Sequence, residues 1–175
     1  MTPQRRLFLV TWLASLAALY QVWTQYGALP AIVDERGALV ALSVVLTTTP
    51  WIAGPGLTYL LRRRASGGVN LPHAEYWFTG ERRGPSLDRL SPYLDSFGTW
   101  LQVFLIAVLA LFVFERVDPR AASASALLFL GLTMAFLGGT VWWVRRVMAA
   151  FPQPEAATRG VKDFRRPRRP GRPGR

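Results

Sequence analysis

The sequence predicts an all-α integral membrane protein with four transmembrane helices and a structured cytoplasmic loop between the second and third helices. Of its 175 residues, 51% are hydrophobic and 13% are aromatic, which is high for a soluble protein of this length. Four stretches are almost free of charge, and each has roughly the 17 to 24 residues that cross a hydrocarbon core of about 30 Å as a helix. The arginines gather on one side of these stretches.

The predicted spans are residues 7–26, 38–61, 98–114 and 121–144. The first span follows Arg5 and Arg6, as in a signal peptide, but its apolar run is longer than a signal peptide's and no obvious small-residue cleavage site follows it. We therefore expect this segment to remain as a membrane anchor. Residues 1–150 then form one transmembrane domain, and residues 151–175 form a separate basic tail.

Arginines predict the orientation of the spans. They precede the first span, close the second, recur in the loop that follows it, and end the fourth at Arg145 and Arg146. The other two connections, residues 27–37 and 115–120, carry at least as much acid as base. Because cytoplasmic loops are enriched in arginine and lysine, we expect both termini and the long loop to be cytoplasmic.

The interiors of the predicted spans lack charged residues and histidine. Their polar residues are milder: Gln21, Gln25, Thr47, Thr48, Thr49, Gln102, Thr133 and Thr140. A proton-coupled pump or an ion transporter needs titratable or ion-ligating groups in the middle of the membrane. The sequence therefore argues against both of these classes.

The second span is irregular, because the string TTTPWIAGPG contains Pro50, Gly54, Pro55 and Gly56. Proline removes a backbone donor and glycine lets the backbone open, so we expect a kink or partial unwinding here. The hydroxyls of residues 47–49 can bond to carbonyls of the preceding turn. Two interpretations stay open, a hinge or binding notch and a kink that serves packing alone.

Small residues recur at intervals of four in the fourth span, at Gly131, Ala135 and Gly139. They fall on one face of a helix, where small side chains let a second helix approach closely. This packing face can serve contacts inside the same bundle, or it can serve self-association or docking on another membrane protein.

The loop between the second and third spans contains the string NLPHAEYWFTGERR. His73 is the only histidine of the chain, and Glu75 follows it at a spacing that matches no familiar metal site. The chain has no cysteine, which excludes disulfides, thiol nucleophiles and thiolate metal sites. We therefore expect no catalytic residue, no metal, no cofactor and no enzyme activity, and the role of His73 stays open.

Aromatic and basic residues of this loop are typical of the membrane surface. Tyr76, Trp77 and Phe78 suit the headgroup layer, and the arginines at 62–64 with Arg82 and Arg83 suit lipid phosphates. The following string SLDRLSPYLDSFGTWL has leucines at helical spacing. Its Ser-Pro pair predicts one short surface helix over residues 86–90 and a second helix that begins at residue 92.

The loop resembles a pattern in small bacterial membrane proteins of unknown function that are related to SdpI-type immunity proteins. There the pattern N-L-P-x-x-x-Y-W-x-x-x-E-R-R links the second and third spans. The matching residues here are Asn70, Leu71, Pro72, Tyr76, Trp77, Glu81, Arg82 and Arg83. The family usually also carries an extracytoplasmic motif, L-P-x-x-V-x-x-H-F-D, followed by a Gly-rich turn. This chain keeps Leu29, Pro30, Val33 and Gly37 without His-Phe-Asp. The resemblance implies a protein of the bacterial cytoplasmic (inner) membrane and does not imply an enzyme. Only the immunity-related branch of the family implies a role against membrane-active toxins.

The C-terminal tail is strongly basic. In TRGVKDFRRPRRPGRPGR, eight basic residues less one aspartate supply +7 of the formal net charge of +11. Its density of proline and glycine predicts disorder. We expect Arg165, Arg166, Arg168 and Arg169 to contact anionic headgroups or a partner protein. We do not expect nucleic-acid binding, because Phe164 is the only aromatic residue available for base stacking.

These features together predict an accessory or structural subunit that packs beside another membrane protein or complex. The alternative is a stand-alone membrane sensor or immunity-type protein, for which the kinked second span and the outer loop would be the working parts. Self-association into a homo-oligomer is compatible with both interpretations.

Overall fold

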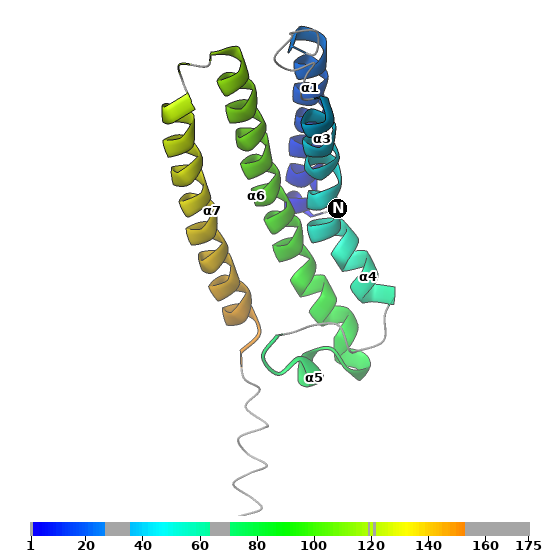
Figure 1. Cartoon of the computed structure of the whole chain (residues 1–175). Coiled ribbons are helices and arrows are strands. Elements are labelled where there is room, and N and C mark those ends of the chain that lie inside the picture. Colours follow the sequence, from blue (N-terminus) through cyan, green and yellow to red (C-terminus); the bar gives the residue numbers. More distant parts are fainter. Residues whose placement is uncertain (1, 27–35, 64–70, 119, 121, 153–175) are drawn as a thin grey trace, which may run out of the picture.

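The computed structural model describes residues 2–26, 36–63, 71–118, 120 and 122–152, and these residues form a helical bundle (Figure 1). Four helical segments in this part of the chain are long and apolar enough to cross a membrane. They are Pro3–Thr24, Gly37–Arg63, Gly80–Glu115 and Ser123–Ala150. Each overlaps one predicted span, so the predicted fold class, an all-α protein with four membrane-spanning helices, is confirmed. The cytoplasmic position of the long loop stays a prediction.

The helices have the following bounds. The first span is α1 (Pro3–Tyr26). The second is continuous through α3 (Arg36–Trp51), the π-helical turn η1 (Ile52–Gly56) and α4 (Leu57–Arg63). The long loop contains α5 (Ala74–Trp77) and the 3-10 turn η2 (Gly80–Arg82). The third and fourth spans are α6 (Arg83–Val117) and α7 (Ala122–Ala150).

Helix α6 is the centre of the bundle. It packs against α1, α3, η1 and α4 on one side and against α7 on the other (Figure 1). The short helix α5 lies beneath the end of the bundle at which α4 ends and α6 begins (Figure 1). We refer to this end, where α7 also finishes, as the loop end.

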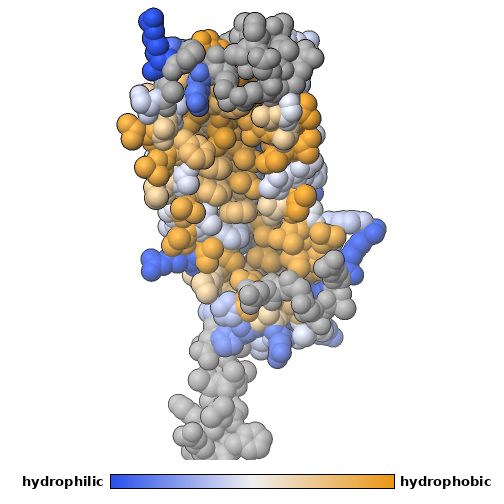
Figure 2. Space-filling model, viewed as in Figure 1, coloured by the Kyte–Doolittle hydropathy of each residue, from blue (hydrophilic) through white to orange (hydrophobic). Residues whose placement is uncertain are grey.

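Buried hydrophobic side chains form two clusters. The bundle core comes from α1, α3 and α6 and contains Leu19, Leu39, Leu46, Leu105, Leu109 and Val113. The loop-end cluster contains Phe78, Leu87, Leu90, Leu94, Val147, Ala150 and Phe151. Figure 2 shows apolar surface through the middle of the visible face and most of the hydrophilic residues near its two ends. This distribution suits a bundle whose middle lies in lipid.

The region before the third span differs from its prediction. Residues 83–117 form one continuous helix with Pro92 inside it, so the predicted break at the Ser-Pro pair is wrong. Pro92 removes only the bond to the carbonyl of Asp88, an exposed residue whose carbonyl can bond to water. Continuity also places Leu87, Leu90 and Leu94 on one face, and all three are buried in the loop-end cluster. Burial of this face outweighs the local cost of the proline.

The second span contains a π-helical turn where the sequence places its prolines and glycines. A Cβ added at Gly56 would lie 2.7 Å from the carbonyl oxygen of Trp51, closer than real Cβ atoms come, so glycine is required for this wider turn. A Cβ at Gly54 would lie 3.3 Å from the carbonyl oxygen of Leu94 in α6. The turn therefore brings the backbones of the second and third spans close together.

Side chains satisfy backbone groups along this irregular span. Thr47 Oγ1 donates to the Ser43 carbonyl at 2.8 Å and Thr48 Oγ1 donates to the Val44 carbonyl at 2.6 Å, which confirms the predicted back-bonding at these two residues. Pro50 has no N–H to donate to the carbonyl of Leu46, four residues earlier. Gln102 Nε2 of α6 donates to that oxygen instead, at 3.2 Å.

Candidate functional site

The loop motif forms a turn followed by the single-turn helix α5. The N–H of Ala74 donates to the Leu71 carbonyl at 3.1 Å. His73 has φ 58° and ψ 33°, a left-handed conformation that is uncommon for residues other than glycine. Its carbonyl accepts hydrogen bonds from the N–H groups of Tyr76 at 2.9 Å and Trp77 at 3.2 Å. His73 thus sets the direction of the chain into α5, while its side chain remains exposed.

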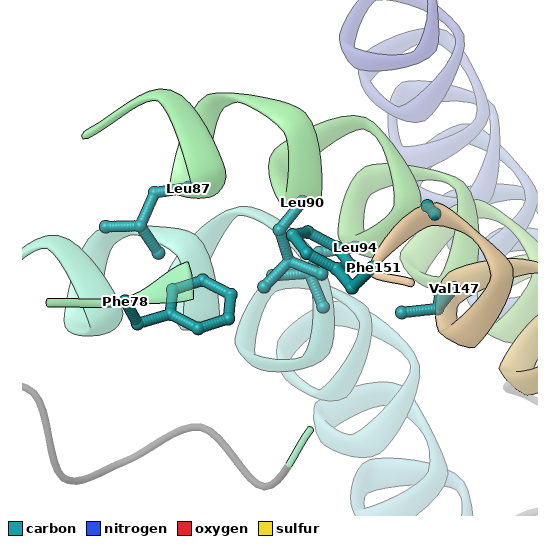
Figure 3. Close-up of a cluster of buried hydrophobic side chains, with 7 residues drawn as sticks. Phe78, Leu87, Leu90, Leu94, Val147 and Phe151 are labelled. Atoms are coloured by element: carbon teal, nitrogen blue, oxygen red, sulfur yellow. The ribbon is translucent and has the colours of Figure 1, made fainter. Parts of the chain in front are cut away.

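Aromatic residues of the motif pack inward onto the end of α7. The ring centroid of Trp77 lies 5.8 Å from that of Phe151, edge to face, and the Phe78 centroid lies 5.6 Å from Phe151. Figure 3 shows Phe78 and Phe151 converging with Leu90 in the loop-end cluster. Phe78 is 2% exposed, so the predicted contact of its ring with lipid headgroups is wrong. The reason is a partner distant in sequence, because Phe151 closes over it.

Tyr76 and Trp77 are only partly buried. Their rings contact each other edge to face at 5.1 Å, and the Arg82 guanidinium lies 4.1 Å from the centre of the Tyr76 ring. The indole Nε1 of Trp77 is buried and has no hydrogen-bond partner among the described residues. Contact of these two rings with lipid headgroups stays a prediction.

Arginines of the loop end are tied to the protein itself. Arg62 forms an ion pair and hydrogen bond with Asp88 of α6. Arg83 donates to the Leu61 carbonyl at 2.8 Å, which joins the start of α6 to the end of α4. The Arg63 guanidinium lies 4.5 Å from the centre of the Tyr59 ring. These arginines therefore fix the loop end as well as carrying positive charge.

A buried carboxylate lies where α6 crosses α1 and η1. Asp95 is 0% exposed, and neither of its oxygens has a hydrogen-bond partner among the described residues. Arg5 Nη1 lies 4.0 Å from Asp95 Oδ1, and the Arg5 side chain is 36% exposed. A buried carboxylate with one distant cation is costly in an apolar bundle. This pair ties the beginning of α1 to α6.

The backbone around Asp95 is closely packed. A Cβ at Gly98 would lie 2.9 Å from Phe8 Cε2 and 3.0 Å from the Pro50 carbonyl oxygen, so α6 meets both neighbours at this glycine. Trp51 packs edge to face against Phe8 at 5.5 Å. The crossing therefore leaves little room for water to reach the carboxylate.

Sequence reasoning missed Asp95 because the predicted third span began at residue 98. A signal was nevertheless present. Asp95, Gly98 and Gln102 are spaced by three and four residues, which puts a carboxylate, a glycine and an amide on one helical face. An apolar helix with such a face is expected to turn it toward neighbouring helices.

The predicted packing face of α7 is divided between two environments. A Cβ at Gly139 would lie 2.6 Å from Trp100 Cζ2, so this glycine accommodates an indole of α6 inside the molecule. Nothing lies within 4 Å of a Cβ added at Gly131 or Gly138, and Ala135 between them is exposed. The structure therefore brings Gly131, Ala135 and Gly138 together on an open face.

The described part of the chain contains no group of three or more side chains that could hold a metal ion. His73 and Glu75 are both exposed. Several predicted residues lie outside the described part: Asn70 of the loop motif, the outer motif at residues 29–33, and Arg165, Arg166, Arg168 and Arg169 of the tail.

Comparison with known proteins finds no matching family model, no significantly similar curated protein and no significantly similar solved structure. The resemblance to the SdpI-related proteins therefore stays a prediction from the loop motif.

Proposed function

We propose that the protein is a non-enzymatic membrane subunit that packs through α7 beside another membrane protein or complex. The observation that carries this proposal is the exposure of α7. In its most apolar stretch only 6% of the residues are buried within the chain, against 28% for α6. Helix α7 packs chiefly on α6, which leaves most of its circumference for lipid or protein.

The open small-residue face favours protein over lipid as the neighbour on one side. Gly131, Ala135 and Gly138 form a shallow strip along α7, and a helix backbone can approach such a strip closely. Close approach increases dispersion contacts, which are a main source of helix association where lipid weakens the hydrophobic effect. A partner helix with small residues of its own fits this strip best.

We further propose that the loop end faces the cytoplasm of a bacterial inner membrane, with both chain termini on that side. The arginines at 5, 6, 62, 63, 82, 83, 89, 145 and 146 support this orientation through the positive-inside rule. A reporter domain fused after Arg175 is expected to be active only in its cytoplasmic form. Activity of a periplasmic reporter at this position would reverse the orientation.

The subunit proposal is tested by extracting tagged protein from native membranes in a lipid-preserving polymer and identifying co-migrating species by native mass spectrometry. We expect one partner in a fixed ratio. Recovery of the monomer alone contradicts the proposal and favours a stand-alone sensor or immunity-type protein. Recovery of a dimer or higher homo-oligomer assigns the α7 face to a second copy of the same chain.

Variants locate the contact on α7. Gly131→Leu and Ala135→Leu are expected to reduce recovery of the partner about tenfold, because each leucine keeps the helices apart. Neither should lower the stability of the isolated chain, since these positions are open. Ala126→Leu is the matched control, because Ala126 is also exposed on α7 but lies about a third to a half of a turn away from the residues of the strip. Equal losses for Ala126→Leu and Gly131→Leu would contradict the assigned face.

A further inference from the structure

A cavity of about 790 Å³ lies between the beginning of α1, the first half of α6 and the second half of α7. Its size is within the range typical of small-molecule sites, about 300–1,000 Å³. The residues that line it and carry the argument are Arg89, Ser96, Trp100, Gly139, Trp142 and Arg146. None of them belongs to the loop motif or the tail.

The two ends of the cavity differ in chemistry. Arg89 precedes Trp100 on α6 by roughly 16 Å of helix, and Arg146 follows Gly139 on α7 by roughly 10 Å, at 1.5 Å per residue. Because α6 and α7 run in opposite directions, both arginines lie at the loop end of the cavity. The opposite end consists of the Trp100 ring against Gly139. The cavity is therefore cationic at one end and apolar at the other.

The two arginines have no carboxylate within ion-pair distance among the described residues. Their guanidinium groups face aromatic rings instead, with Arg89 5.7 Å from the centre of Phe151 and Arg146 5.3 Å from the centre of Trp142. Two such cations without an acid between them are complementary to an anion. Guanidinium groups match phosphate particularly well, because each can donate two parallel hydrogen bonds.

The apolar wall is fixed in place. Trp143 Nε1 donates to the Tyr93 carbonyl at 3.0 Å and to Ser96 Oγ at 3.3 Å, which orients this indole against α6. Trp100 stacks on Phe136 with centroids 6.1 Å apart. A wall held in this way needs little rearrangement to receive a ligand.

The cavity is also accessible from the side of the bundle. Trp142 is 60% exposed and Trp100 is 38% exposed, and both lie on surfaces that face lipid in a membrane. A ligand with a long apolar chain can therefore enter from the bilayer, whereas a small water-soluble phosphate would leave the indole wall without contacts. The combination of cationic end, apolar wall and lateral opening defines the ligand class.

We propose that this cavity binds one phospholipid with an anionic headgroup. The phosphate lies between Arg89 and Arg146 at the loop end, and an acyl chain runs along Trp142 and Trp100 toward the middle of the membrane. This site is distinct from the tail, and the inference does not depend on the subunit proposal, because an isolated chain can bind the lipid.

The test uses purified full-length protein in detergent micelles, with phosphatidylglycerol or phosphatidylcholine added in equal amounts. Native mass spectrometry measures the fraction of protein that carries one lipid. The variant is Arg89→Gln with Arg146→Gln. Its matched control is Arg63→Gln with Arg145→Gln, which removes the same charge from two exposed arginines that do not line the cavity.

The wild-type protein is expected to retain phosphatidylglycerol at least tenfold better than phosphatidylcholine. Each cavity arginine should contribute about fivefold to this affinity, so the double variant should lose about 25-fold. The control pair should lose less than about twofold. Equal losses in both pairs would show general surface attraction and overturn the proposal, as would equal retention of the two lipids by the wild-type protein.

A second measurement covers the case in which the arginine variants do not fold. Because the chain has no cysteine, Ser96→Cys introduces a single thiol into the cavity wall. Phosphatidylglycerol should slow its reaction with a water-soluble maleimide at least fivefold compared with phosphatidylcholine. Protection by glycerol 3-phosphate at the same concentration would identify a site for soluble phosphates and overturn the lipid assignment, and lack of protection by phosphatidylglycerol would overturn it as well.

Discussion

Pro50 and Gln102 form an energetic pair that a double-mutant cycle can measure. Pro50 leaves the Leu46 carbonyl without its usual helical donor, and Gln102 Nε2 donates to it from α6 at 3.2 Å. Both Pro50 and Gln102 are fully buried, so water is a poor substitute. Pro50→Ala restores a backbone N–H that can bond to the Leu46 carbonyl within the helix. The requirement for the Gln102 amide should then disappear.

The magnitude follows from two opposing effects of Gln102→Leu. Loss of the donated bond leaves the Leu46 carbonyl buried and unsatisfied, which costs about 1–3 kcal/mol of unfolding free energy. The Gln102 amide oxygen is itself buried without a partner among the described residues, so its removal offsets about 1 kcal/mol of this cost. We expect a net loss of about 1 kcal/mol beside Pro50 and a gain of about 1 kcal/mol beside alanine. The coupling free energy is then about 2 kcal/mol, at the upper end for polar pairs between transmembrane helices.

The assay compares four proteins, the wild type, Pro50→Ala, Gln102→Leu and the double variant, by unfolding in mixed micelles with increasing denaturing detergent. Tryptophan fluorescence reports unfolding. The cycle cancels the packing change at Pro50, because this change occurs in both backgrounds. The control combines Gln102→Leu with Pro55→Ala. The effects of these two substitutions on the free energy of unfolding should be additive, because Pro55 is not the residue whose N–H would bond to the Leu46 carbonyl. Additivity within about 0.3 kcal/mol for the Pro50 pair would refute the reasoning.

Three further outcomes are expected. Gly139→Ala should lower the free energy of unfolding by about 1–3 kcal/mol, because the added Cβ would meet an indole at 2.6 Å, whereas Gly138→Ala should be neutral. Arg5→Gln should lower the free energy of unfolding by about 1 kcal/mol, because Asp95 loses the cation 4.0 Å away. The double variant Arg5→Gln with Asp95→Asn should regain most of this loss, because the buried group is then neutral. Phe151→Ala should lower the free energy of unfolding by about 3 kcal/mol and speed proteolysis of the loop end in membranes, because Phe151 is 1% exposed. Proteolysis at the wild-type rate would contradict the conclusion that Phe151 holds the loop end together.

Length and charge were sufficient to predict the four spans, because a hydrocarbon core imposes both requirements on any crossing helix. They were insufficient for the beginning of α6. A Ser-Pro pair is typical of a helix start, and residues 86–92 follow that pattern locally. The buried face formed by Leu87, Leu90 and Leu94 depends on α5 and α7, which approach only in the folded bundle. Burial of these leucines in the folded bundle therefore favours one continuous helix, although the Ser-Pro pair locally favours a helix start at residue 92.

The same limit applies to the loop motif. Three consecutive aromatics beside arginines are typical of the headgroup layer, and nothing in the local sequence distinguishes Phe78 from its neighbours. Phe78 is buried because Phe151, more than seventy residues later, ends α7 at the same place. The glycines of α7 show a similar division. Their spacing of four residues predicted the same environment for Gly131 and Gly139, but of these two only Gly139 lies opposite a large side chain of α6.

The cationic side chains of the cavity place the proposed lipid headgroup toward the loop end. Arg89 and Arg146 lie at that end of the cavity, whereas Asp95 and Arg5 lie further along the bundle, where α6 crosses α1 and η1. Toward the opposite end the bundle core is filled by side chains such as Leu109. Buried polar side chains occur along the length of the bundle, from Ser86 near the loop end through Asp95 and Gln102 to Ser125 at the start of α7. The proposed lipid contact therefore rests on two arginines beside an indole wall, and the proposed protein contact rests on the open face of α7.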